Sequence, residues 1–153
     1  MFKRHNDDSD GQETDAVADD SEHLPRLIEL GRALDDAVLA AAAEPLPKLA
    51  ARLMAELFGS QYYPGEWVDL DTVASPLIPP NSGSKFGDPV PDGVRILNDI
   101  AVEAIQLLEH ANLIAPAHWY SGNIWYFGYR STRAGRTALE QGAVEKILTR
   151  EPA

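Results

Sequence analysis

The 153-residue chain contains no cysteine, so it can form neither disulfides nor thiolate–metal bonds. This absence fits a reducing cytoplasm, which is where we expect the protein to be located. Long apolar runs are missing as well, because the longest, Ala37 to Ala43, is too short to cross a bilayer. No apolar segment follows the basic residues near the N-terminus, as a secretory signal would require. We therefore expect no membrane association.

Complete catalytic and cofactor-binding motifs are also missing. His110 and His118 are eight residues apart, and no H-x-x-x-H or H-E-x-x-H spacing occurs. The segment SGSK at residues 82–85 lacks the remainder of a phosphate-binding loop. Asp69 and Asp71 could act as an acid and a base, but the interpretation we prefer is a capping Asp71 beside a solvated Asp69. The sequence therefore predicts a protein that is not an enzyme and has no metal and no cofactor.

Basic residues are scarce: 13 Lys and Arg stand against 24 Asp and Glu, for a net charge of −11. The charge is −6 over residues 1–22, −7 over residues 23–109 and +2 over residues 110–153. Nucleic acid and anionic membranes are therefore unfavourable partners for every part of the chain except the last. Residues 1–22 predict a disordered acidic tail, dispensable for folding, and residues 23–153 predict a single domain with one core.

Apolar residues that recur every three to four positions predict four helices, at 24–41, 46–58, 94–114 and 132–149. Between the second and third helices, residues 75–92 hold five of the eleven prolines. That composition predicts a long loop, of a kind that is usually functional or disordered.

Several residues are expected to cap helices. Asp71 is placed to cap a brief helical turn that continues through residue 74. Either Asp92 or Gly93 can cap the third predicted helix, and either Ser131 or Thr132 can cap the last one.

The period of the pattern changes from 3.6 to 2 after residue 114. Two aromatic runs, 118–120 and 124–129, flank the turn sequence Ser121-Gly122-Asn123 and predict a β-hairpin. A short alternating run at 67–70 predicts a third strand. The whole chain is therefore expected to be an α+β domain, mostly helical, with a two- or three-stranded sheet.

Six of the twelve aromatic residues lie in the hairpin. The side that holds Trp125 and Phe127 is expected to pack on the third predicted helix. The other side would leave Trp119, Tyr120 and Tyr126 exposed, and exposed Tyr and Trp are enriched in protein interfaces. These three are the candidate partner-binding residues. The alternative is that all of the aromatics are core or half-buried.

The stretch at about 102–140 resembles the second half of winged helix-turn-helix proteins of the MarR and PadR kind. Those proteins have a helix ending in Leu-Glu…Leu-Ile, then a hairpin wing, then a Thr-x-x-Gly-x-x-x-Leu entry to the next helix. The matching residues here are Leu108, Glu109, Leu113, Ile114, Thr132, Gly135 and Leu139. The resemblance implies a winged-helix transcriptional regulator that binds duplex DNA as a homodimer, with residues 24–58 supplying the dimer contacts.

The chain departs from that family where DNA would be read. The helix that enters the major groove in the family carries Asp99, Glu103 and Glu109 here, against a single Arg95. Carboxylates repel phosphates, and the wing tip at 121–123 has no Lys or Arg. A second function therefore stays open, which is a non-enzymatic protein-interaction module that keeps the scaffold and binds no nucleic acid.

Arg130, Arg133 and Arg136 form the only basic cluster of the sequence. They are the candidate nucleic-acid-binding residues, since they surround the start of the last predicted helix. The alternative is a solvated surface that pairs with acids such as Glu140.

Overall fold

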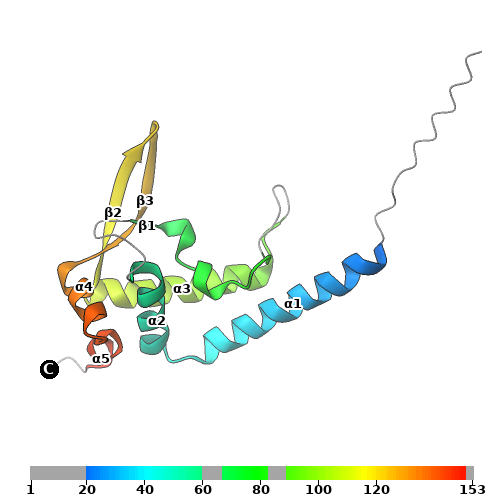
Figure 1. Ribbon diagram of the computed structural model, residues 1–153, viewed down its shortest axis with the longest axis horizontal. Helices are drawn as coiled ribbons and strands as arrows, with labels where there is room; N and C mark the ends of the chain where they lie inside the picture. Colours follow the sequence, from blue (N-terminus) through cyan, green and yellow to red (C-terminus); the bar gives the residue numbers. More distant parts are fainter. Residues whose placement is uncertain (1–19, 60–66, 83–88, 151–153) are drawn as a thin grey trace, which may run out of the picture.

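The computed structural model describes residues 20–59, 67–82 and 89–150, and it has an α+β architecture (Figure 1). Helices make up most of the described chain, and one antiparallel sheet of three strands stands against them. No helix in the described ranges combines the length and apolar character needed to span a membrane. In chain order the elements are α1 (Asp20–Ala43), α2 (Leu46–Phe58), β1 (Val68–Asp69), the 3-10 helices η1 (Leu70–Thr72) and η2 (Ser75–Leu77), α3 (Asp92–His110), β2 (Ile114–Ser121), β3 (Ile124–Ser131), α4 (Arg133–Glu140) and α5 (Val144–Leu148).

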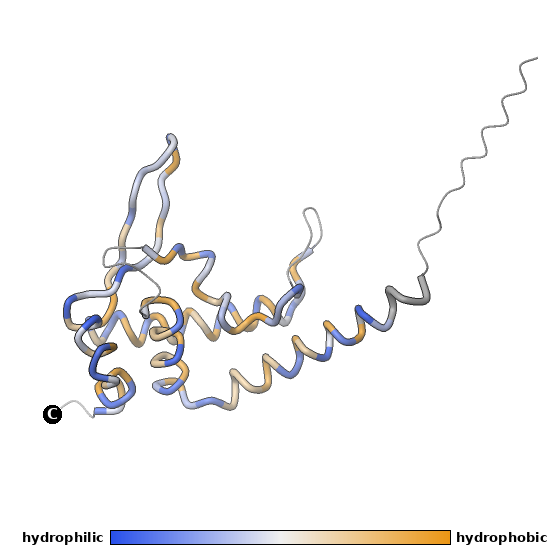
Figure 2. Tube along the Cα trace, viewed as in Figure 1, coloured by the Kyte–Doolittle hydropathy of each residue, from blue (hydrophilic) through white to orange (hydrophobic). Residues whose placement is uncertain are grey.

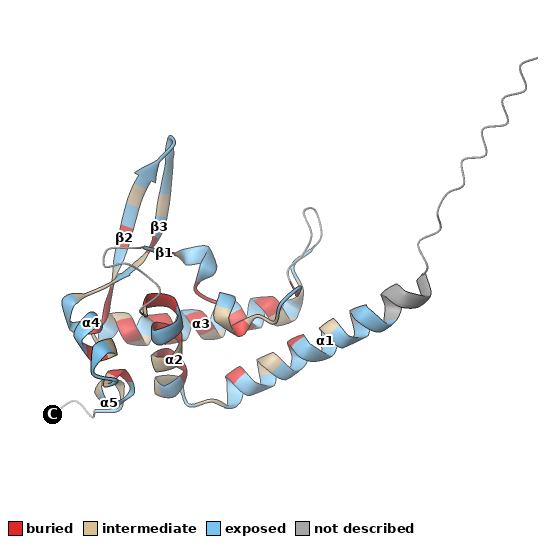
Figure 3. Cartoon of the chain, viewed as in Figure 1, coloured by how far each residue is buried: buried red, intermediate tan, exposed pale blue. Residues whose placement is uncertain are grey.

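The core forms where α2 and α3 pack against each other. Leu49 and Leu53 of α2 and Leu97 and Leu108 of α3 are almost fully buried, as their helical spacing predicts. Burial of each such side chain stabilises the fold by about 1.5–3 kcal/mol. Figure 2 shows the resulting apolar positions along both helices, and Figure 3 shows the buried residues concentrated there.

The first helix packs on α3 only in part. Leu34 and Ala41 are buried among the α1 residues whose burial is described, and Gly93 at the start of α3 leaves room for the Leu34 side chain. Most of the remaining described surface of α1 is exposed (Figure 3). The helix begins at Asp20, inside the stretch predicted to be a tail, and residues 1–19 lie outside the described residues.

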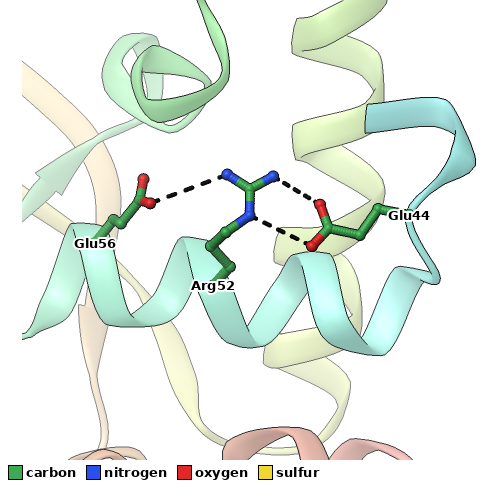
Figure 4. A network of polar contacts seen from close by, with 3 residues as sticks. All are labelled: Glu44, Arg52 and Glu56. Atoms are coloured by element: carbon green, nitrogen blue, oxygen red, sulfur yellow. Dashed lines mark hydrogen bonds and ion pairs between the residues drawn. The ribbon is translucent and has the colours of Figure 1, made fainter. Parts of the chain in front are cut away.

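An ion pair joins the end of α1 to α2 (Figure 4). Arg52 Nη2 donates to Glu44 Oε2 at 2.7 Å, and Arg52 Nη1 lies 4.0 Å from Glu56 Oε1. The hydrogen bond from Arg52 lowers the pKa of the Glu44 carboxyl below its ordinary value, although partial burial opposes the shift. This pair spans the corner at Pro45, which precedes the first residue of α2.

Two of the predicted C-terminal helix ends are wrong, and residues with positive φ explain both. The third helix ends at His110 because Asn112 has φ +57°, and the amide of Leu113 donates to the carbonyl of Leu108. The last predicted helix divides at Gly142, where φ is +60°. Hydrogen bonds of the same kind, from amides that follow the helix to carbonyls in its last turn, end α4 there. Helix α5 begins two residues later.

The predicted caps have mixed outcomes. The α3 helix begins at Asp92 after Pro91 without a side-chain cap, so neither Asp92 nor Gly93 caps it. Asp69, not Asp71, caps η1, because its carboxylate accepts the Asp71 amide at 3.0 Å. Thr132 caps α4 as predicted.

The sheet has the strand order β1-β3-β2, so the second strand of the hairpin is central. Val68 pairs with Tyr129 and Asp69 with Gly128, which confirms the short strand expected near residue 68. A side chain at position 128 would collide with the carbonyl oxygen of Val68. Glycine at this position therefore allows β1 to approach the hairpin.

The loop before α3 is long, as predicted, although η2 lies within it. Residues 83–88 of this loop, which include most of the SGSK segment, lie outside the described residues.

Candidate interaction surface on the hairpin

The β2–β3 hairpin closes through a tight turn at Gly122 and Asn123, whose φ angles are +56° and +68°. Two successive positive φ angles favour a turn whose twist matches that of the strands. The Tyr120 hydroxyl also donates to Asn123 Oδ1 at 3.0 Å. The turn thus sets the register of the hairpin. Ser121 pairs with Ile124, and the other pairs of β2 with β3 follow from this first one.

Residues that pair directly across the strands share a side of the hairpin. One side carries the pair Trp119 and Tyr126, whose rings stack with centroids 5.6 Å apart. Trp67 lies against Trp119 at 4.9 Å, and both Trp119 and Tyr126 are half-buried. We call this the stacked side. Trp67, the residue just before β1, therefore covers part of the hairpin.

The opposite side has a buried base and an exposed outer half. At the base, Tyr129 and Ile114 pack on the core. Farther out, Tyr120 lies beside Trp125 with ring centroids 5.1 Å apart, and His118 lies beside Phe127 at 5.8 Å. We call these four residues the outer aromatic patch. Its three large rings have high exposed fractions of 54% for Tyr120, 61% for Trp125 and 60% for Phe127.

The outer half is exposed because the hairpin is longer than the body it packs on. Figure 3 shows the hairpin standing away from the helices, with buried positions only near its base. Trp125 and Phe127 share a side with Tyr129, as the alternation predicts, but they extend past the end of the core. The expectation that they pack on the long helix is therefore wrong.

Of the three predicted partner-binding residues, only Tyr120 is exposed, and the other two are half-buried. Trp119 and Tyr126 are on the stacked side. The exposure of Trp125 and Phe127 was not predicted, because no local signal in the sequence distinguishes the two sides of the hairpin. The deciding contact comes from Trp67, about fifty positions earlier in the chain.

The arginine cluster lies where the hairpin enters α4. Arg130, Arg133 and Arg136 are all exposed. Among the residues that the structure describes, no carboxylate lies within 4.0 Å of any of the three, so the expected pairing with Glu140 is not formed.

Thr132 and Gly135 account for the Thr-x-x-Gly sequence at this junction. The Thr132 hydroxyl accepts the Gly135 amide at 2.9 Å and donates to the carbonyl of Asn112 at 2.6 Å. A side chain on Gly135 would collide with the carbonyl oxygen of Leu113. The two residues thus hold the start of α4 close to the backbone that follows α3. The three arginines take no part in this contact and face solvent.

The acidic side chains of α3 do not form one surface. Asp99 and Glu103 are exposed, but Glu109 is partly buried near Tyr129. Burial raises the pKa of the Tyr129 phenol, and the charge of Glu109 adds to the shift. Asp92, at the start of the helix, is exposed as well, so three exposed carboxylates remain on α3 beside the exposed Arg95.

In the described ranges, no group of three or more His, Asp or Glu side chains is arranged to hold a metal ion. Comparison of the chain with protein-family models, curated proteins and solved structures finds no match to any of them.

Proposed function

We propose that this protein is a non-enzymatic interaction module on a winged-helix scaffold, and that the outer aromatic patch binds a protein partner. The observation that carries the proposal is the exposure of Tyr120, Trp125 and Phe127 side by side on one side of a projecting hairpin. Soluble proteins rarely expose several adjacent large rings unless the rings contact something.

The order of the elements supports the winged-helix part of the proposal. A helix, α2, precedes a short strand, and helical segments and α3 then lead into the hairpin. The second hairpin strand lies between the other two strands. The winged-helix proteins that residues 102–140 resemble run from a helix through a hairpin wing into a further helix, as α3, the β2–β3 hairpin and α4 do here, and the junction at Thr132 and Gly135 resembles the one that follows their wing.

The energetics of the patch are adequate for an interface. A large aromatic side chain buries about 150–250 Å² when fully covered. Covering the exposed half of one ring therefore removes on the order of 100 Å² from water, which is worth about 2–3 kcal/mol. Three such rings would form the kind of aromatic centre on which most interface energy depends.

The test uses a photoreactive phenylalanine analogue in place of Tyr120, with crosslinking in the cell that makes the protein. We expect one discrete adduct with another protein. The double substitution Trp125→Ala and Phe127→Ala should abolish it and leave the melting temperature nearly unchanged, because both rings are exposed.

The matched control is Ile96→Ala with Val102→Ala, which removes two exposed apolar side chains from α3. This control should keep the adduct. Loss of the adduct in the control but not in the aromatic variant would contradict the proposal.

Duplex DNA is the second candidate partner, as for a transcriptional regulator. One observation favours it: the three exposed arginines have no carboxylate within 4.0 Å in the described chain, and two of them lie in the first turn of α4. Exposed carboxylates on α3 and the net charge of −11 oppose it.

A gel-shift series on random duplex DNA at several salt concentrations tests this candidate. If DNA binds, replacing Arg130, Arg133 and Arg136 by alanine should reduce the slope of log affinity against log salt by roughly 0.9 per lost phosphate contact. Absence of binding at low salt eliminates DNA and leaves the protein-partner proposal. Binding with an unchanged slope would mean that the contacts lie elsewhere.

A further inference from the structure

Helix α1 carries a second stripe of residues, on the side that faces away from α3. The side toward the body contains the buried Leu34 and Ala41. The half-buried Leu30 lies one turn before Leu34 on this side, and the half-buried Ala37 lies between Leu34 and Ala41. On the other side, exposed residues recur at alternating intervals of three and four, the spacing of a coiled-coil seam. This outer seam consists of Pro25, Ile28, Arg32, Asp35, Leu39 and Ala42, all of them exposed.

Two members of the outer seam are large apolar side chains in water. Leu39 is 68% exposed, the highest value among the large hydrophobic residues described, and Ile28 is 52% exposed. Neither faces the body, and Figure 1 shows that α1 lies along the edge of the molecule, with its N-terminal half extending away from the core. A solvent-exposed helix gains nothing from apolar residues at these positions unless another surface covers them.

The outer seam is complementary to itself when it is read in reverse. Residues equally distant from its midpoint form the pairs Ile28 with Leu39 and Arg32 with Asp35, and the outermost pair is also uncharged. In an antiparallel pair of two α1 helices, each apolar residue would meet an apolar residue and each arginine would meet an aspartate. Twofold symmetry produces each contact twice.

A parallel pair would have the opposite result. It would set Arg32 against Arg32 and Asp35 against Asp35 of the second copy, and like charges at a seam repel. The charge order therefore selects the antiparallel orientation.

We propose that α1 is a homodimerisation helix, and that its outer seam binds the outer seam of a second copy of this chain in the antiparallel orientation. The proposal is independent of the function assigned to the hairpin, because it involves a different helix. Other charged groups on α1 oppose the pairing: Glu29 and Asp36 flank the seam and approach each other between copies. The Ile28–Leu39 and Arg32–Asp35 contacts must therefore outweigh this repulsion.

The first test exchanges the charges and follows the association by sedimentation over a concentration series. The wild-type chain should reach twice its mass of 16.7 kDa. Arg32→Asp and Asp35→Arg should each raise the dissociation constant about tenfold or more, because each creates two like-charge contacts. The double variant restores opposite charges and should return to within about threefold of the wild type.

Arg26→Asp is the matched control, since it makes the same charge change at an exposed position of α1 outside the seam. It should leave the dissociation constant nearly unchanged. Three results would overturn the proposal: a wild-type monomer at every concentration, a double variant no better than the single ones, or a control as damaging as Arg32→Asp. Helical circular dichroism confirms that each variant is folded.

The second test uses the absence of cysteine from the chain. Chains carrying Ile28→Cys and chains carrying Leu39→Cys should form a disulfide with each other when mixed under mild oxidation. Neither variant alone should crosslink efficiently, because residue 28 of one copy faces residue 39 of the other. Efficient crosslinking of Ile28→Cys alone would indicate a parallel pair and contradict the proposal.

Discussion

At the scale of single residues, Gly135 leaves no room for a side chain. It is buried in α4, and an added Cβ would collide with the Leu113 carbonyl oxygen and lie 2.7 Å from Cε of Met54. The carbonyl belongs to the backbone and cannot rotate away. We predict that Gly135→Ala lowers the free energy of unfolding by about 1–3 kcal/mol, measured by denaturant titration.

Gly31→Ala is the control for that prediction. Gly31 is exposed within α1, and nothing lies within 4 Å of its potential Cβ. Alanine there should raise the free energy of unfolding by about 0.4–1 kcal/mol, because it restricts the unfolded chain and favours the helix. Equal losses in the two variants would show that the close approach at Gly135 is not the cause.

Glu44 makes a pH-dependent contribution to stability. Its pKa is lowered in the folded state by the hydrogen bond from Arg52, so the ionised form is favoured by folding. That stabilisation is complete at neutral pH, above the ordinary carboxyl pKa, and is lost as the pH falls through the lowered pKa of the folded state. We predict that Glu44→Gln lowers the free energy of unfolding by about 0.5–1 kcal/mol at pH 7, since Arg52 is partly exposed, and that the difference disappears in acid once Glu44 is protonated in the folded protein.

Glu56→Gln tests whether the effect belongs to the close pair. Glu56 lies near the same arginine, but its Oε1 is 4.0 Å from Arg52 Nη1, and its side chain is more exposed than that of Glu44. Its loss should change the free energy of unfolding by at most about 0.3 kcal/mol at either pH. Matching pH profiles for the two variants would contradict the assignment to Glu44.

At the scale of elements, the junction between the hairpin and α4 depends on Thr132. Its hydroxyl caps α4 and also binds the backbone at the end of α3. We predict that Thr132→Ala lowers the free energy of unfolding by about 1–2 kcal/mol, measured by denaturant titration.

Two variants bracket the Thr132 prediction. Thr132→Ser keeps the hydroxyl and should recover most of the loss. Thr137→Ala is the control within the same helix, because Thr137 is exposed and its hydroxyl makes no hydrogen bond in the described structure. A destabilisation of Thr137→Ala as large as that of Thr132→Ala would mean that the cap is not responsible.

The sequence predicts where most elements lie, because periodicity and turn residues act locally. The second helix begins and ends where its prolines and Gly59 indicate, and the hairpin turn is the one its glycine and asparagine favour. Helix ends were harder to predict. The end of α3 depends on Asn112 adopting a positive φ, which asparagine tolerates but does not require.

The exposed side of the hairpin could not be predicted for a different reason. Successive side chains of a strand point to opposite sides, so the sequence places Tyr126 and Phe127 on different sides of the hairpin. It does not indicate which of the two sides another element will cover. That depends on Trp67 stacking on Trp119 and on how far the strands extend past the core. Both are tertiary facts, so the predicted contact residues included only one member of the outer aromatic patch.

At the scale of the whole molecule, the features that remain unpaired lie on separate surfaces. The outer aromatic patch is on the hairpin, the arginines are at the start of α4, and the outer seam is on α1. Figure 1 shows α1 and the hairpin as different projections from the body. A molecule arranged in this way could dimerise through one surface and bind a partner through another.

The most direct test of the proposed function compares two neighbouring residues of β3. Tyr126 and Phe127 are adjacent in sequence but point to opposite sides of the hairpin. A photoreactive phenylalanine analogue at position 127 should yield a discrete adduct with another protein in the cell, and the same analogue at position 126 should yield little or none. An adduct only from position 126, or none from either position, would contradict the claim that the outer aromatic patch is the contact surface.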